Sequence, residues 1–179
     1  YTLSLYHNEA LKSLSRKRFF IVEDLRKAKL AVNSLVQMIF PEFKTLFSNI
    51  YGGSAIAILK TYGTPKALAK AHVSKVASLL HGRCKCTAEQ LIAVAKTSVG
   101  ISEPHYAFQL LDAIEEMEHI SRRIKSYDVQ IKAYVDELYP NLLSIPGVGY
   151  TTAGLIAGEI RDINRFHSAE SLISYSGID

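Results

Sequence analysis

The apolar residues of the first long stretch, residues 8–39, recur at heptad spacing. Apart from Arg18, one set occupies every seventh position and a second set follows three residues on: Leu11, Leu25, Val32 and Ile39, then Leu14, Ile21, Ala28 and Leu35. A stripe with this spacing, the seam of the helix, lies along one face of an α-helix. The pattern therefore predicts one long amphipathic helix. Pro41 is expected to end it, because proline lacks the N–H that the helical ladder needs.

A second stretch with the same pattern follows Ser102, which we expect to cap its helix. Its apolar positions form a strict seven-residue series with partners three residues on: Leu110, Met117, Ile124, Ile131 and Leu138, then Ala113, Ile120, Tyr127 and Tyr134. A periodic pattern of this length without internal Gly or Pro is typical of a coiled coil.

The pattern leaves the partner of each long helix open. The two helices could pair with each other in antiparallel fashion, or each could meet its counterpart in a second subunit. Tyrosines on the seam favour a bundle with both kinds of contact, so we expect a homo-dimer or a higher oligomer. On the solvent face we expect ion pairs one turn apart, Glu118 with Arg122 and Asp128 with Lys132.

Short helices are expected between the two long ones, over residues 42–101. Thr64 and Pro65 offer an N-cap and a first-turn proline, and Thr87 with Gln90 forms a capping box. Strand-like alternation of apolar and polar residues is absent from the sequence. We therefore predict an all-α fold. Residues 1–140 form a helical, coiled-coil dimerisation region with a short-helix insert at 42–101, and residues 141–179 begin a separate helix-hairpin-helix segment.

The segment Leu142 to Ile160 carries the pattern of a helix-hairpin-helix, a backbone clamp for nucleic-acid phosphates. Gly147 and Gly149 are expected to adopt backbone angles that side chains forbid and to leave room for a phosphate. Val148 is expected to point inward and hold the two helices together. The amides after Gly149 then lie at the start of the next helix, where free N–H groups and the helix dipole favour an anion.

The candidate nucleic-acid-binding residues of this hairpin are contiguous: Gly147, Val148, Gly149, Tyr150, Thr151 and Thr152. The two threonines are expected to cap the helix or to add hydroxyl contacts to the phosphate. Such a clamp reads the backbone and carries little base information. The alternative is a purely structural corner between helices, which a single glycine could provide.

The net charge of +4 and pI near 9.0 are compatible with a polyanionic partner without requiring one. A basic cluster on the first long helix consists of Lys12, Arg16, Lys17, Arg18, Arg26, Lys27 and Lys29. Its centre, Arg16, Lys17 and Arg18, is a further candidate for nucleic-acid contact. A run of this kind is more often a solvated face. Arg18 falls on the seam, so it is expected to meet either a phosphate or an acidic partner helix.

Metal chemistry finds little support in the sequence. Cys84 and Cys86 could complete a zinc site only with His72 and His81, and we interpret them as reduced thiols in a loop.

The carboxylates nearest the hairpin are Glu159 and Asp162, which we expect to pair locally with Arg161 and Arg165. A metal-dependent nuclease needs more converging acids. We therefore assign no catalytic and no metal-binding residue.

The sequence contains no apolar run long enough for a membrane span. Its first residue is Tyr, and no leader pattern follows. We expect a cytoplasmic protein without a membrane partner, and a chain cut from something longer.

The amino-acid sequence of the hairpin resembles that of the C-terminal domain of the bacterial insertion-sequence 110/116/902 transposases. The resemblance rests on Leu143 to Gly149, Thr152-Ala153, Glu159-Ile160, Asp162, Arg165-Phe166 and Tyr175 to Gly177. The start of the chain, with Arg16 to Arg18 and the long helix, is also similar to that family.

The resemblance implies a transposase whose RuvC-like N-terminal domain binds Mg²⁺ through four acidic residues, and whose serine beyond the hairpin attacks DNA. Neither segment lies in this chain, so we carry over no catalytic residue and expect no cofactor here. It also implies DNA as the main partner and a structured guide RNA as a second candidate.

Two alternatives remain open. A helix-hairpin-helix repair glycosylase usually has Lys just after the hairpin or Asp about twenty residues on, whereas Tyr150 stands at the first site and Asp162 comes too early. The other alternative is a coiled-coil interaction module in which the hairpin is only a corner.

Overall fold

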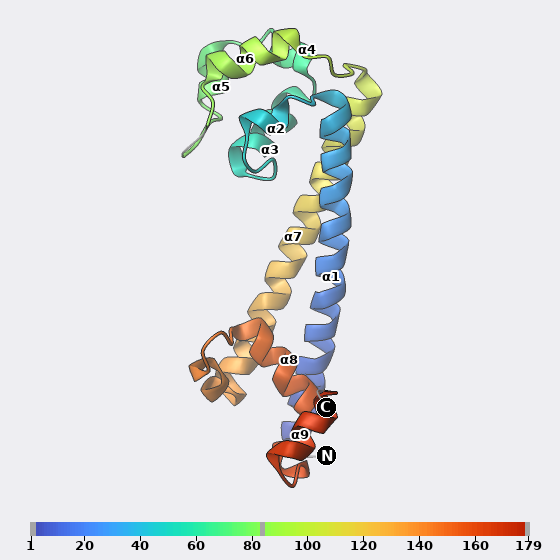
Figure 1. Cartoon of the computed structure of the whole chain (residues 1–179), viewed down its shortest axis with the longest axis vertical. Helices are drawn as coiled ribbons and strands as arrows, with labels where there is room; N and C mark the ends of the chain where they lie inside the picture. Colours follow the sequence, from blue (N-terminus) through green and yellow to red (C-terminus); the bar gives the residue numbers. More distant parts are fainter. Residues whose placement is uncertain (1–2, 83–84, 178–179) are drawn as a thin grey trace. The chain divides into compact units, whose positions relative to one another are not determined.

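A computed structural model describes residues 3–82 and 85–177, and every regular element within these ranges is helical (Figure 1). The two long helices are α1 (Leu3–Ile39) and α7 (Pro104–Leu138). Between them lie α2 (Phe43–Leu46), α3 (Gly53–Tyr62), α4 (Pro65–Leu68), α5 (Val73–Ala77) and α6 (Ala88–Thr97). After α7 come the 3-10 helix η1 (Pro140–Ser144), α8 (Tyr150–Ile160), the 3-10 turn η2 (Ile163–Arg165) and α9 (Ala169–Ser176). The predicted all-α class, with short helices between two long ones, is confirmed.

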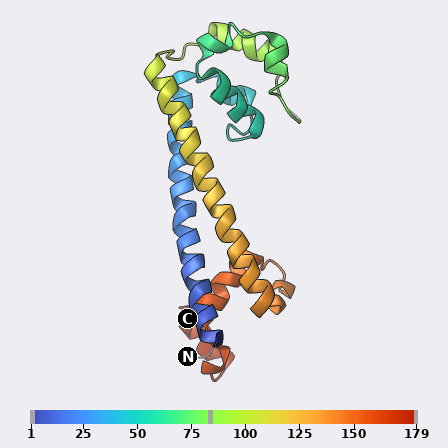
Figure 2. The ribbon, with the colours of Figure 1, turned by 180° about the vertical axis from the view of Figure 1, so that it is seen from behind.

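The chain divides into two compact units. Unit 1 contains residues 1–22 and 122–179, and unit 2 contains residues 23–121. Each unit holds one part of α1 and one part of α7. In both units these parts lie side by side and run in opposite directions, as the two opposed views show (Figures 1 and 2).

The predicted heptad positions are the ones that face inward. In α1 the buried members are Leu11, Ile21, Ala28, Val32 and Ile39, with Leu14, Arg18, Leu25 and Leu35 half-buried. In α7 the buried members are Leu110, Ala113, Met117, Ile120, Ile124 and Ile131, with Tyr127, Tyr134 and Leu138 half-buried. The hydrophobic pattern therefore identified the packed face of both helices.

Contacts in unit 1 show that the two seams meet within the chain. Arg18 donates a hydrogen bond to Asp128, and further toward the N-terminus Asn8 accepts one from the Tyr139 hydroxyl just beyond α7. Moving backward along α1 thus leads forward along α7, which defines an antiparallel pair. Arg18 meets an acidic helix, as one of its two alternatives predicted. Dimerisation stays a prediction.

The expected ion pairs one turn apart on α7 are wrong. Asp128 is engaged by Arg18, while Lys132 pairs with Asp136 at 2.7 Å. Glu118 pairs instead with Lys60 of α3 at 2.8 Å. Packing against neighbouring helices offered these carboxylates closer cations than their own helix did.

The short helices of unit 2 begin as the sequence predicts. The Thr64 side chain accepts a hydrogen bond from the Ala67 amide at 3.3 Å, and Thr87 and Gln90 form the expected capping box. The second long helix differs slightly, because Glu103 rather than Ser102 supplies the carbonyl that receives the Ala107 amide.

In unit 1, α8 lies directly against α1 through two glycines that are one turn apart. A Cβ added to Gly158 would lie 2.7 Å from the Lys12 Cα, and one added to Gly154 would lie 2.7 Å from the Ile131 Cγ2. Beside them Leu11, Ile131, Val135, Ala153 and Ala157 form a buried core. The small residues let the backbones approach, and this close contact fixes α8 on both long helices.

Ser15 lies in the same contact, and its buried hydroxyl is expected to lower the stability of the protein. Its side chain is 3% exposed, and its hydroxyl has no hydrogen-bond partner among the described residues. A buried polar group without a partner costs about 1–3 kcal/mol, so we expect Ser15→Ala to stabilise the protein by about 1 kcal/mol. Urea denaturation followed by circular dichroism measures this. A loss of more than about 1 kcal/mol would show that the hydroxyl is in fact satisfied.

Candidate nucleic-acid interface

The hairpin is built from η1, a turn at residues 145–149, and α8. Its first arm is a 3-10 helix of five residues rather than the expected α-helix. Pro140 and Pro146 bracket this arm, and so short a segment between prolines cannot complete an α-helical ladder. Leu142 and Leu143 on this arm pack against the core of unit 1. The second arm, α8, is an α-helix as predicted.

The two hairpin glycines have different roles. Gly147 has φ = 85°, a conformation that side chains disfavour, so the expectation holds there. Gly149 has φ = −96° and ψ = 177°, which other residues also adopt, so the expectation of a forbidden angle is wrong for it. Apart from the adjoining residues, no atom of the described part of the chain lies within 4 Å of a Cβ added to either glycine. Both glycines therefore face open space, where a bulky ligand could approach the main chain.

The N-terminus of α8 is open. Gly149 holds the N-cap position and has no side chain with which to cap the helix. The amides of Tyr150, Thr151 and Thr152 belong to the first turn, where an α-helix offers no internal acceptor. The threonine hydroxyls do not cap the helix, so this part of their prediction is wrong. Free N–H groups and the positive dipole end together favour an anion here.

Lys132 of α7 brings a cation to this same end of α8. Its Nζ lies 2.7 Å from the Tyr150 hydroxyl, 4.0 Å from the centroid of the Tyr150 ring and 2.7 Å from Asp136 Oδ2. The hydrogen bonds that Lys132 donates, to Asp136 first and then to Tyr150, raise its pKa, which keeps it charged. A hollow of about 350 Å³ lies here, lined in part by Lys132, Tyr150 and Thr151. No pattern in the sequence pointed to Lys132 as part of this site, because it lies on another element.

The turn itself is held from behind. Val148 is half-buried and packs on the core formed by α1, α7 and α8, as its predicted inward orientation requires. The Val148 amide also donates to the Ile145 carbonyl at 3.0 Å, which closes the turn. The open end of α8 is thus presented by a braced scaffold rather than by a loose loop.

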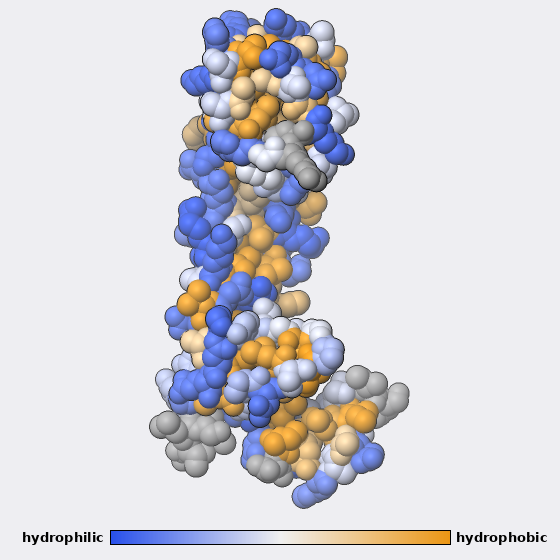
Figure 3. All heavy atoms as spheres, turned by 90° about the vertical axis from the view of Figure 1, so that its left-hand side faces the viewer, coloured by the Kyte–Doolittle hydropathy of each residue, from blue (hydrophilic) through white to orange (hydrophobic). Residues whose placement is uncertain are grey.

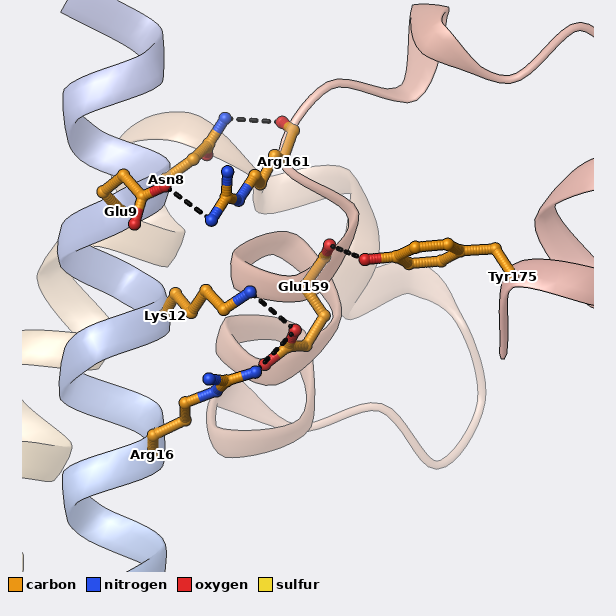
Figure 4. A network of polar contacts seen from close by, with 7 residues as sticks. All are labelled: Asn8, Glu9, Lys12, Arg16, Glu159, Arg161 and Tyr175. Carbon is orange, nitrogen blue, oxygen red and sulfur yellow. Dashed lines mark hydrogen bonds and ion pairs between the residues drawn. The ribbon is translucent and has the colours of Figure 1, made fainter. Parts of the chain in front are cut away.

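Two members of the basic cluster of α1, Lys12 and Arg16, are engaged by Glu159 within unit 1 (Figure 4). Arg16 donates from Nε to Glu159 Oε1 at 2.8 Å and from Nη2 to Oε2 at 3.2 Å. Lys12 Nζ lies 3.0 Å from Glu159 Oε2. Lys17 is exposed, and Arg18 is turned toward Asp128. The structure therefore does not bring Arg16, Lys17 and Arg18 together on one surface, and their contact with nucleic acid stays a prediction.

The local pairing expected for Glu159 is wrong, because its partners lie on α1. Arg161 pairs with Glu9 of α1 at 2.7 Å. Its carbonyl accepts a hydrogen bond from the buried Asn8 amide at 2.5 Å, and its φ of 61° ends α8 (Figure 4). Two ion-pair sites and one hydrogen bond thus attach the end of α8 to the start of α1.

The Glu159 carboxyl is expected to make stability depend on pH. Hydrogen bonds from Arg16 first, and then Lys12, lower its pKa. A lowered pKa contributes stability above the unfolded value of about 4.3, and this stability is lost as the pH falls through the folded value. Because the ion pair is largely exposed, we expect the unfolding free energy of wild type to exceed that of Glu159→Gln only modestly at neutral pH, and the difference to shrink as the pH falls below the unfolded value. Urea denaturation over a series of pH values tests this, and a difference that stays constant into acid would contradict it.

Beyond α8 the chain continues into a further helix, α9. Ser168 caps α9 through a capping box with Ser171. The Arg165 guanidinium lies over the rings of Phe166 and Tyr175, at 4.6 and 4.5 Å from their centroids. A hollow of about 580 Å³ separates α8 from α9, and apolar surface is exposed on unit 1 at the lower end of Figure 3.

Residues 3–82 and 85–177 contain no grouping of side chains that could hold a metal ion. Cys86 is buried, and Cys84 lies outside the described residues. Within the same ranges, no helix is both long and apolar enough to cross a membrane.

The hairpin and the helices that follow it correspond to a known protein family. Residues 139–179 match the sequence model of the family described as Transposase IS116/IS110/IS902 family. This confirms the predicted resemblance for the C-terminal part of the chain and supports a transposase role. No curated protein matches the chain.

Proposed function

We propose that this chain is the part of an insertion-sequence transposase that dimerises and holds DNA by its phosphate backbone during transposition. The observation that carries the proposal is the open N-terminus of α8 behind the Gly147 to Gly149 turn. It combines uncapped amides, open space at both glycines and a cation, Lys132, on the neighbouring helix. Backbone amides and a lysine at a helix start are suited to a phosphate group and read no base edge.

The rigidity of the hairpin supports a positioning role. Its turn packs on the core of unit 1, and its helix is held on α1 by the close contact at Gly158 and by Arg161. A clamp that contacts only the backbone gains from such a fixed frame, because its contribution is the position of the DNA rather than its sequence. We assign strand cleavage, and the Mg²⁺ that it needs, to other parts of the parent transposase.

The proposal predicts salt-dependent binding of duplex DNA. Fluorescence anisotropy with a labelled duplex should show binding that weakens as salt rises, because each neutralised phosphate releases counterions. An anisotropy that stays unchanged at high protein concentration and at all salt concentrations would contradict the proposal. A labelled structured RNA in the same assay tests RNA as a second partner.

The dimer part of the proposal needs a surface other than the heptad seam, because α1 and α7 use that seam for each other. Phe19 and Phe20 on α1 are 58% and 62% exposed, and their ring centroids lie 5.9 Å apart. Exposed neighbouring aromatics of this kind favour association. Light scattering of the purified chain measures its mass, and a monomer at all concentrations would remove dimerisation from the proposal.

The same use of the seam bears on the alternatives. A coiled-coil interaction module would offer its heptads to a partner, whereas here the α1 and α7 seams meet within the chain. The repair-glycosylase alternative gains nothing from the structure, because Tyr150 at the hairpin exit is bound to Lys132 and the match at residues 139–179 is to a transposase family.

A further inference from the structure

The carboxylate of Glu159 lies in a site built from two cations on consecutive turns of α1. Arg16 grips both carboxylate oxygens, at 2.8 and 3.2 Å, and Lys12 reaches one of them at 3.0 Å. Paired donors of this kind fit a phosphate as well as a carboxylate, because guanidinium N–H groups match two oxygens of either group. Lys12 and Arg16 therefore form an anion site whose occupant in the free protein is Glu159 (Figure 4).

The site is accessible to an external ligand. The side chains of Arg16 and Glu159 are 58% and 39% exposed, although Lys12 is 17% exposed. Exposed ion pairs contribute little net stability, so an incoming polyanion can displace the carboxylate without unfolding the contact. The approach of Gly158 to the Lys12 backbone holds α8 against α1 independently of this ion pair. The cations can therefore change partners while the helices stay docked.

We propose that Lys12 and Arg16 are a second nucleic-acid phosphate site, which Glu159 occupies until a phosphate displaces it. This rests on the proposed function and extends it: the hairpin supplies one phosphate contact, and α1 supplies another that is closed in the free protein. Glu159 lies nine positions after Tyr150, about 14 Å along the helix axis, so one duplex can reach both ends of α8. The Glu159 carboxylate acts as an internal competitor of DNA.

The sign of one substitution separates this role from a structural one. Glu159→Gln removes the competitor, and we expect it to bind duplex DNA roughly three- to tenfold more tightly, with a salt slope steeper by about 0.9 for each phosphate gained. If Glu159 served only to hold the hairpin in place, the same change would weaken binding or leave it unaltered. The measurement is the anisotropy titration over a series of salt concentrations.

Two variants test whether the gain comes from the lost negative charge alone and whether it depends on Arg16. Glu137→Gln makes the same charge change at an exposed position of α7 and should alter affinity much less. Adding Arg16→Gln to Glu159→Gln should cancel most of the gain, because the released cation is gone. Equal gains in Glu159→Gln and Glu137→Gln, or a gain that survives Arg16→Gln, would overturn the second site.

The wild-type titration tests the proposed function, and the Glu159→Gln titration tests the second site. If wild type shows no salt-sensitive binding, the proposed function fails; if wild type binds and Glu159→Gln binds no more tightly, only the second site fails. If Glu159→Gln lacks the wild-type circular dichroism spectrum, the single variant Arg16→Gln tests the second site instead. A salt slope reduced by about 0.9 supports the site, and an unchanged slope overturns it.

Discussion

Gly158→Leu is expected to lower the free energy of unfolding by about 3 kcal/mol and to detach α8 from α1. A Cβ at this position would lie 2.7 Å from the Lys12 Cα and 2.8 Å from the Lys12 nitrogen, and backbone atoms cannot yield as a flexible side chain can. The leucine must therefore push the two helices apart. Chemical denaturation followed by circular dichroism measures the loss.

Thr152→Leu is the matched control for this change. It introduces the same side chain into the same helix, but at an exposed position, where surface substitutions usually stay within about 0.5 kcal/mol. Comparable losses for the two variants would mean that the α8 contact with α1 is not close-packed. A wild-type stability for Gly158→Leu would mean that α8 does not lie against α1 at all.

Gly149→Val is expected to weaken duplex binding by roughly tenfold, about 1.4 kcal/mol, while leaving the protein folded. Its backbone angles suit valine, and beyond its chain neighbours no atom of the described residues lies within 4 Å of the added Cβ. The branched side chain therefore fills only the space in front of the α8 amides, where a phosphate would approach. Anisotropy titration at low salt gives the affinity.

Gly53→Val serves as the control, since Gly53 begins α3 in unit 2 and is also surrounded by open space. It should bind DNA as wild type does. If Gly149→Val binds as tightly as Gly53→Val and both are folded, the hairpin is only a corner between helices. That result would favour the interaction module.

Much of the fold was predictable because the pattern of apolar residues decides which face of a helix is buried. The heptads located both long helices and their packed faces, and the caps at Thr64 and Thr87 predicted where two shorter helices begin. Local chemistry was enough for these features. It failed at η1, where the hairpin sequence predicted an α-helix and two prolines left room only for a 3-10 helix.

The candidate site was predictable in its main-chain part alone. Gly147, Val148 and the α8 amides belong to one contiguous segment, so their conformation follows from neighbouring residues. Lys132 joins them from α7, and the spacing along the chain gave no hint of it. The glycines at 154 and 158 were a sequence signal that the hydrophobic pattern alone did not exploit, because close packing of small residues needs a known partner helix.

By itself the sequence determined the two long helices and their inward faces, the turn at Gly147 and the relation of residues 139–179 to a transposase family. Only the tertiary structure decided that the two seams meet within the chain, and that Glu159 takes Lys12 and Arg16 from across unit 1 rather than the neighbouring arginines. The physical reason is the separation along the chain over which each interaction acts. Helix periodicity and capping act over a few residues, whereas an ion pair depends on where helices pack, and residues 143 positions apart can become its partners.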